Sequence, residues 1–122
     1  HIGTRYRWLA PLGAADLDGD GAMEIAYIDR PHLARILRVW RYDAPRRALV
    51  EVAAAEGHTN HRIGERTIAG GIRDCGAGPE VVTASGDWAR LRATRLEGGR
   101  LVSRDIGTHS GRDSFTAALA CR

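Results

Sequence analysis

Two stretches of the chain repeat one order of short apolar segments and turns. Each copy has a segment of small residues, an apolar segment that begins with Glu, an arginine-containing segment that ends at a turn, and a Leu-Val pair. The matched residues are 12–18 with 68–74, 24–26 with 80–82, 38–43 with 92–97, and 49–50 with 101–102. A period of roughly 50 residues made of short strands is in the range of four-stranded propeller blades. The repeat therefore predicts an all-β fold of antiparallel four-stranded meanders.

The repeat also divides the chain. Repeat one takes in about residues 9–57, repeat two about 65–107, and a third repeat starts within 108–122. The run 115–120 matches the small-residue segment of the other copies, so we expect it to be the first strand of a third sheet. Since closed propellers usually have four or more blades, we expect either a longer parent chain or self-association of copies.

Strand signals support this architecture. Residues 24–28, 35–42 and 48–52 are rich in β-branched and aromatic side chains, and Pro31 and a turn at 43–45 separate them. Short segments of this kind between turn signals predict antiparallel strands. Only 31–37 and 53–56 are compatible with helices, and both are too short to change the fold class.

The composition excludes several classes of protein. The chain has 122 residues, of which 43% are hydrophobic and 27% charged, as in a folded globular domain. No apolar run approaches the roughly 18 residues that cross a bilayer, so membrane insertion is not expected. The net charge is +3 and all 18 basic residues are arginine, but they alternate with acids along the chain. Without a basic stripe, nucleic-acid binding is not expected.

The strongest chemical signal is a run of carboxylates in the first repeat. Asp16, Asp18 and Asp20 alternate with other residues, and glycines allow the backbone to curl so that the three side chains converge. Ca²⁺ binds six to eight oxygens, and here Ala22 would add its backbone carbonyl and Glu24 its carboxylate. The segment therefore predicts a calcium site with the ligands Asp16, Asp18, Asp20, Ala22 and Glu24.

Three alternatives for this loop were weighed. An EF-hand needs a Glu at position twelve between two helices, whereas position twelve here is Tyr27 and the following residues predict a strand. Mg²⁺ requires a tighter octahedron and retains several waters, which makes it a poorer match. A solvated Asp-Gly turn without any metal remains the plain structural alternative.

With the repeat, the segment 15–26 resembles the FG-GAP and VCBS repeat family, whose blades carry an Asp-x-Asp-x-Asp-Gly-x-x-Asp loop between their first two strands. Glu24 stands where the family pattern ends in Asp. The resemblance implies a β-propeller, calcium as a structural element of the loop, and a secreted, periplasmic or cell-surface location.

The second repeat departs from this pattern. Its loop keeps only Asp74 and Glu80 at ligand positions, which is too few carboxylates to hold calcium well. Cys75 lies in this loop and Cys121 lies at the end of the third repeat's first segment. We therefore expect a Cys75–Cys121 disulfide that joins neighbouring blades where the metal site is lost. Two free thiols are the alternative, because an even count of cysteines allows both.

A polar segment between the repeats and one tryptophan are candidate ligand contacts. The residues are His58, Asn60, His61, Arg62 and Trp88. Histidines and arginines in such a connection are most often structural, and His58 with His61 lacks the Cys or acid that would complete a zinc site. The remaining interpretation is contact with a sugar or an anionic group, for which Trp88 would be a stacking surface. A role of Trp88 in the core or in covering a sheet edge is the favoured alternative.

No catalytic motif is present in the sequence. It contains no Gly-x-Ser-x-Gly elbow, phosphate-binding loop or zinc-binding helix motif. We therefore predict a non-catalytic, calcium-binding module that mediates binding or adhesion to a protein or glycan. The alternative is a lectin-like propeller or the accessory part of a polysaccharide-active enzyme.

Overall fold

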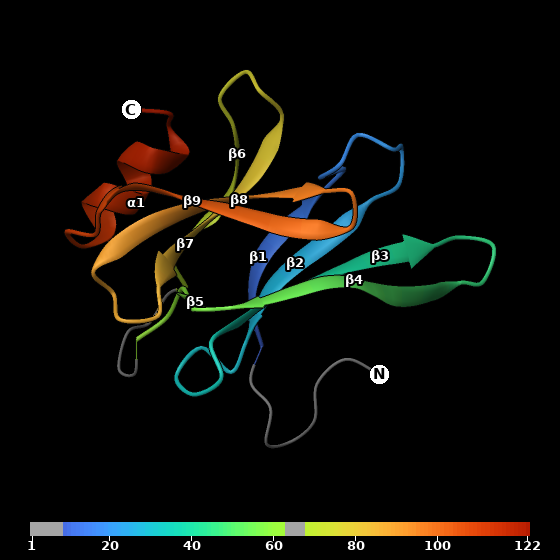
Figure 1. The fold of residues 1–122 in the computed structure, drawn as a ribbon, viewed down its shortest axis with the longest axis horizontal. Coiled ribbons are helices and arrows are strands. Elements are labelled where there is room, and N and C mark those ends of the chain that lie inside the picture. The colour runs from blue at the N-terminus through green and yellow to red at the C-terminus, as the bar shows by residue number, and fades with distance from the viewer. Residues whose placement is uncertain (1–8, 63–67) are drawn as a thin grey trace.

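The computed structural model describes residues 9–62 and 68–122, and within these ranges the chain forms two antiparallel sheets and one helix. Sheet 1 is a four-stranded meander in which every strand pairs with the next one along the chain (Figure 1). Its strands are β1 (Leu9–Ala15), β2 (Glu24–Asp29), β3 (Ile36–Asp43) and β4 (Ala48–Glu56). This sheet lies within the predicted first repeat, about 9–57.

Sheet 2 repeats the meander with one change in its first strand. Its strands are β5 (His58–Thr59), β6 (Gly71–Asp74), β7 (Pro79–Ser85), β8 (Arg90–Glu97) and β9 (Arg100–Thr108). Both β5 and β6 pair with β7, β6 along residues 79–82 and β5 along residues 84–85. The strand that corresponds to β1 is thus made of two pieces. The all-β prediction of antiparallel meanders is confirmed, whereas the proposed start of repeat two, near residue 65, lies outside the described residues.

The turns between strands follow from their residues. Gly98 and Gly99 form the two-residue connection between β8 and β9, and both have positive φ, 57° and 76°. Paired left-handed residues give the hairpin turn whose twist matches that of the flanking strands. The hairpin between β3 and β4 turns at 44–47, where the N–H of Arg47 donates to the carbonyl of Ala44 at 3.2 Å.

The main apolar core lies between the two sheets. Alternate residues of β2 and β3 point into it, which is the period expected of strands with one face buried. Sheet 2 contributes Val81 and Leu96, and Leu17 enters from the loop after β1. The remaining buried members are Ala10, Ala26, Ile28, Leu37 and Val39.

The sheets approach closely at their first strands. A Cβ on Gly70, which has φ +85°, would lie 2.9 Å from the side chain of Leu12 on β1. A Cβ on Gly13 would lie 3.1 Å from the side chain of Ile72, on the facing strand β6. The small residues that recur at this place in the repeat are therefore explained by the close packing of the first strands.

The end of the chain corrects one prediction. The run 115–120 was expected to be a strand, but Arg112–Leu119 forms the helix α1. The alanines favour a helix, and Phe115, Ala118 and Leu119 have the i, i+3, i+4 spacing of one helical face. That face packs on the side of sheet 2 that is remote from sheet 1, so the molecule has three layers (Figure 1). None of the described residues forms a helix long and apolar enough to span a membrane.

Candidate metal centre

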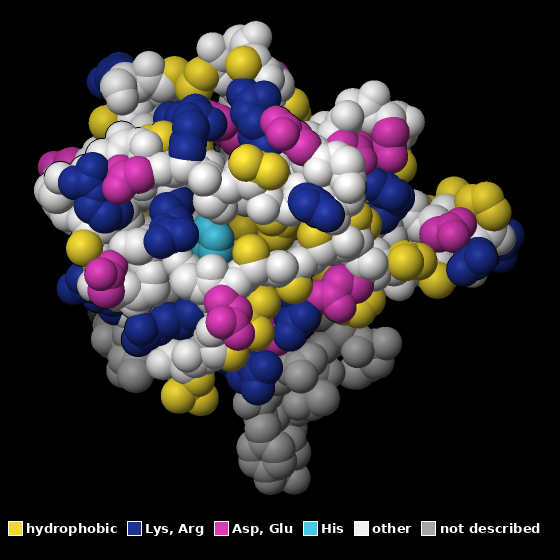
Figure 2. Space-filling view, in the orientation of Figure 1, with side chains coloured by type: hydrophobic (Ala, Val, Ile, Leu, Met, Phe, Trp, Pro, Cys, Tyr) yellow, Lys and Arg dark blue, Asp and Glu magenta, His cyan; other side chains and the backbone are white. Residues whose placement is uncertain are grey.

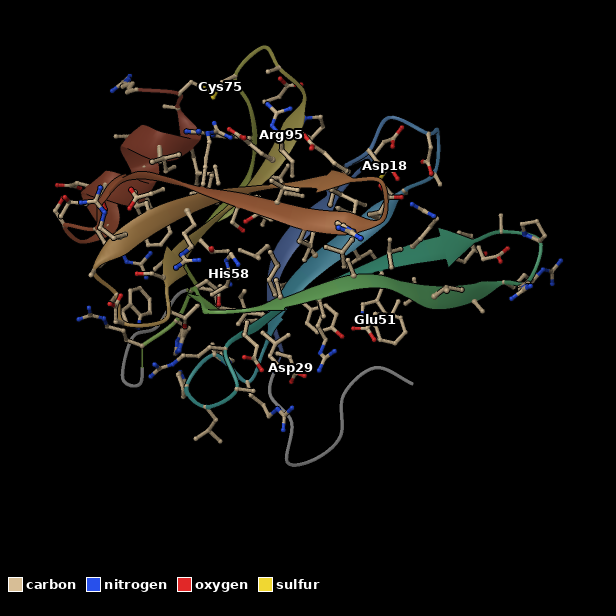
Figure 3. The ribbon with its side chains drawn as sticks, in the orientation of Figure 1. Asp18, Asp29, Glu51, His58, Cys75 and Arg95 are labelled. Carbon is tan, nitrogen blue, oxygen red and sulfur yellow. A yellow bond between two sulfur atoms is a disulfide. The ribbon has the colours of Figure 1, made fainter. Side chains whose placement is uncertain are left out.

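The four carboxylates singled out in the sequence come together in the loop between β1 and β2. Ala15 at the end of β1 pairs with Glu24 at the start of β2, so the loop leaves and re-enters the sheet at neighbouring points. One carboxylate oxygen from each of Asp16, Asp18, Asp20 and Glu24 lies within 4.8 Å of the others. Asp18 lies at the edge of the molecule, at the opposite end of β2 from Asp29 (Figure 3).

Asp16 shapes this loop. Its Oδ1 accepts hydrogen bonds from the backbone N–H groups of Gly19 at 2.9 Å and Asp20 at 3.2 Å, and its Oδ2 accepts one from Gly21 at 2.8 Å. The loop can curl around one side chain because Gly19 and Gly21 have φ values of 76° and 88°, which glycine adopts without strain. The alternating aspartates therefore converge because the backbone wraps around the first of them.

Glu24 and Leu17 tie the loop to the core. The Glu24 side chain is fully buried, and its Oε1 accepts a hydrogen bond from the N–H of Leu17 at 2.8 Å. Leu17 is 5% exposed and packs with Val81 and Leu96 of sheet 2. The conformation of the acidic loop therefore depends on the packing of Leu17 between the two sheets.

Arg41 is a functional residue that the sequence analysis missed. It lies opposite Glu24 on β3, and its Nε donates to Oε2 of Glu24 at 3.1 Å. Its Nη2 donates to Asp18 at 2.7 Å and lies 3.3 Å from Asp20. One guanidinium thus partly neutralises a cluster of four carboxylates. A signal was present in the sequence, since the repeat places Arg95 at the matching position.

The carboxylates perturb one another. The pKa of Asp18 is raised, first by burial and then by its contact with the Asp20 carboxyl. The pKa of Asp20 is lowered, chiefly because its carboxylate accepts a hydrogen bond from the N–H of Ala22. Two carboxyls that face each other in this way favour a shared proton or a shared cation.

The donor set fits a hard divalent cation. All four side chains offer oxygen, and oxygens bound to one Ca²⁺ at 2.3–2.6 Å can lie at most about 5 Å apart. The observed spread of up to 4.8 Å falls inside that limit. The cluster could therefore hold a metal ion.

In sheet 2 the corresponding site is filled by arginines. Glu80 is 2% exposed and sits at the start of the buried part of β7, as Glu24 does on β2. Its carboxylate accepts from Nε of Arg73 at 2.7 Å and from Arg104 at 2.6 and 3.1 Å, and Nε of Arg95 lies 3.5 Å away. These bonds hold the pKa of Glu80 below its usual value, Arg104 having the largest effect. Three guanidinium groups thus surround the carboxylate that corresponds to Glu24.

The strand pairing corrects one detail of the repeat alignment. Ala15 pairs with Glu24 and Arg73 pairs with Glu80, so Asp74 corresponds to Asp16 and not to Asp18. Glu24 follows Asp16 by eight positions, whereas Glu80 follows Asp74 by six. The second loop is therefore two residues shorter, which removes one of the alternating aspartates. Asp74 keeps the role of Asp16 in shaping the turn, since its Oδ1 accepts from Gly76 at 2.9 Å and Gly78 at 3.3 Å.

The predicted disulfide is confirmed. Cys75 and Cys121 are bonded, with their Cα atoms 5.7 Å apart. Figure 3 shows Cys75 in the loop between β6 and β7, close to the end of α1. A second contact lies nearby, because Arg73 donates to the carbonyl of Ala118 at 2.8 Å. The bridge therefore joins α1 to sheet 2; it does not join two blades.

His58 and Asn60 lie in the interior. The His58 ring is 1% exposed, and its Nδ1 is 2.7 Å from Oγ1 of Thr83. Asn60 is fully buried and donates from Nδ2 to the carbonyl of Ala10 at 3.3 Å, which links β1 to the segment after β5. Both side chains hold strands together and are remote from solvent.

Burial of His58 predicts a stability loss in weak acid. Its pKa is lowered to about 4, mainly by burial and further by the charge of Arg92. The unfolded chain, with an ordinary histidine pKa of about 6.5, binds the proton more readily, so stability falls as pH drops from 6.5 toward 4. Relative to a His58→Gln variant, the wild type should lose about 2 kcal/mol of unfolding free energy between pH 7.5 and 5. Urea unfolding at the two pH values measures this, and equal losses in both proteins would contradict it.

The other candidate contacts gather at one pocket. His61, Arg62 and Trp88 line a hollow together with His32 and Arg35, which the sequence analysis did not single out. The guanidinium of Arg62 lies over the Trp88 ring, 4.6 Å from its centroid, so one face of this ring is covered. No sequence motif marks His32 and Arg35, because they come from the connection between β2 and β3, far along the chain.

Comparisons with protein-family models, with curated proteins and with solved structures give no match to this chain.

Proposed function

We propose that the chain is a calcium-binding repeat module of the FG-GAP/VCBS type with a non-catalytic role in binding or adhesion. The observation that carries the proposal is the cluster of Asp16, Asp18, Asp20 and Glu24, with oxygens within 4.8 Å, between the first two strands of a meander. These four side chains would hold the ion, and the Ala22 carbonyl is the predicted fifth ligand. Calcium would supply positive charge where one arginine meets four carboxylates.

The loop is also placed to shape a surface for a partner. Gly21, Ala22 and Met23 line a groove of about 640 Å³ with the hairpin of β3 and β4. Met23 and Tyr42 in this groove are 52% and 47% exposed, and the N–H of Tyr42 donates to the carbonyl of Met23 at 3.1 Å. Exposed apolar side chains gathered in one groove are typical of interaction sites. Calcium would thus stabilise one wall of a binding groove.

A location outside the cytoplasm belongs to the same proposal. The Cys75–Cys121 disulfide supports it, because such bonds form and persist in oxidising compartments. Calcium sites of extracellular modules are also matched to the high calcium levels of those compartments.

A thermal melt tests the metal directly. Calcium at about 100 times its Kd should stabilise the fold by about 2.7 kcal/mol, and a chelator should remove the gain. Magnesium at the same concentration should have a smaller effect, since it resists dehydration. Identical melting temperatures in calcium and in chelator would contradict the proposal.

Arg41 is expected to weaken calcium binding. An ion held by Asp18, Asp20 and Glu24 must compete with the guanidinium that now pairs with all three. Arg41→Gln should tighten calcium binding about fivefold, because breaking partly exposed ion pairs costs about 1 kcal/mol. The same variant should be less stable without calcium, since it leaves the buried Glu24 carboxylate without its cation.

Arg38→Gln is the matched control for this variant. Arg38 lies on the same strand but pairs with Asp29 and Glu51, away from the loop. Calcium titrations of the two variants should therefore differ, with Arg38→Gln close to wild type. Weaker calcium binding in Arg41→Gln would show instead that Arg41 positions the ligands.

A further inference from the structure

A cationic pocket lies at the other end of β2 from the acidic loop. It has a volume of about 200 Å³ and is lined by residues from the connections between strands of both sheets: Pro31, His32, Arg35, His61, Arg62 and Trp88. Two guanidinium groups and two imidazoles thus meet in one hollow. Among the described residues no carboxylate lines it.

Two acids that are near the lining residues in sequence, Asp29 and Asp87, are engaged elsewhere. Asp29 is buried and accepts from Arg30 at 3.1 Å and from Arg38 at 2.8 Å. Asp87, next to Trp88, accepts from Oγ of Ser85 at 2.6 Å and from the N–H of Ala89 at 3.0 Å. The positive charge of the pocket is therefore not balanced by these two residues.

The cationic groups are held in place by contacts across the sheets. Arg35 donates from Nη1 to the carbonyl of Gly86 at 2.7 Å, while its Nε is buried and has no hydrogen-bond partner. Nε2 of His32 lies 2.8 Å from Nδ1 of His61. The pKa of His32 is lowered, mainly by burial and further by the charges of His61 and Arg35.

The backbone is strained at two of these residues. Arg35 and Trp88 have φ values of 54° and 63°, in the left-handed region that bulky residues rarely adopt. Such positions cost about 1–3 kcal/mol and gather at binding sites. Both of these strained residues line the same pocket.

We propose that this pocket binds the sulfate or phosphate group of a ligand. The guanidinium groups of Arg35 and Arg62 can form charge-assisted hydrogen bonds with the oxygens of such anions. Arg62, an exposed side chain stacked on Trp88, supplies the guanidinium on the solvent side of the pocket. The site shares no residue with the acidic loop, so it stands or fails independently of calcium binding.

Sulfate titration followed by NMR at constant ionic strength tests the site. Sodium sulfate should produce saturable shifts, with a millimolar Kd, at the amides of His61, Arg62 and Trp88. Arg62→Gln should weaken binding at least about fivefold, as expected for one charge-assisted hydrogen bond. Arg46→Gln is the control, because Arg46 is an exposed arginine at the tip of the β3–β4 hairpin and its loss changes the net charge equally.

Comparing the affinities of a sulfated monosaccharide and of inorganic sulfate distinguishes the two sources of the anion. A sulfated monosaccharide that binds more tightly than inorganic sulfate identifies a saccharide ester as the ligand, and equal affinities identify the free anion. Shifts that do not saturate, equal losses in Arg62→Gln and Arg46→Gln, or a neutral sugar that binds as tightly as its sulfated form would each overturn the proposal.

Discussion

Replacing Glu80 with alanine is expected to lower the free energy of unfolding by about 3–5 kcal/mol, the cost of removing one partner from a buried ion pair. Glu80 accepts hydrogen bonds from Arg73 and Arg104 and is 2% exposed. The side chain of Arg104 is 52% exposed and can turn to solvent, whereas that of Arg73 is 9% exposed and cannot. Most of the loss therefore comes from a guanidinium left buried without its carboxylate.

Urea unfolding with two comparison variants measures this loss. Glu80→Gln keeps the shape and one acceptor oxygen, so its loss should be intermediate. Glu97→Ala removes an exposed acid at the end of β8 and should change stability by less than about 0.5 kcal/mol. A loss below about 1 kcal/mol in Glu80→Ala would show that the arginine cluster is not a structural element.

Removing the disulfide should cost a similar amount. Cys75 and Cys121 are separated by 46 positions, and closing a loop of that length in the unfolded chain corresponds to about 4 kcal/mol in the chain-entropy account. The double variant Cys75→Ser, Cys121→Ser also frees the end of α1, whose Phe115 and Ala118 cover the apolar face of sheet 2. In this variant, hydrogen exchange of the backbone amides should therefore be faster in α1 than in wild type, with a smaller change in sheet 1.

Reductant provides the control for the disulfide. Reducing the wild type should shift its urea midpoint to that of the double-serine variant, and the variant itself should not respond. A variant within about 1 kcal/mol of wild type would mean that packing alone holds α1 in place.

The meanders could be predicted from the sequence because their signals are local. Short runs of apolar, β-branched and aromatic residues in β2 and β3, and turns such as Gly98–Gly99, require no knowledge of distant contacts. The same holds for the acidic loop, where spacing and glycines are enough to bring the aspartates together. The repeat also suggested the Cys75–Cys121 pair; the bond is present, but the strand on which that expectation depended is the helix α1.

Helix α1 departs from the repeat pattern, which predicts a strand there. The run from Phe115 to Ala120 resembles the small-residue first strands, but alanine favours a helix and Phe115, Ala118 and Leu119 have helical spacing. The division of the first strand into β5 and β6 was also hidden, since it depends on how residues 58–59 meet β7.

The residues that the sequence does not single out contact partners that are far away along the chain. Arg73 and Arg104 converge on Glu80 from β6 and β9, and His32 meets His61 across 29 positions. Arginines are spread along the whole chain and mix with acids on the face shown in Figure 2, so composition alone does not indicate which of them form a cluster. Only the register of the strands identifies those that do.

Calorimetric titration of calcium into the metal-free protein tests the proposed function most directly. We predict one calcium ion per chain, with a Kd of about 10⁻⁵ to 10⁻³ M, and at least a tenfold loss in Asp18→Asn. Asp113→Asn, which alters an exposed acid of α1, should bind calcium like wild type. Absence of saturable binding at millimolar calcium, or equal affinity in wild type and Asp18→Asn, would contradict the calcium site.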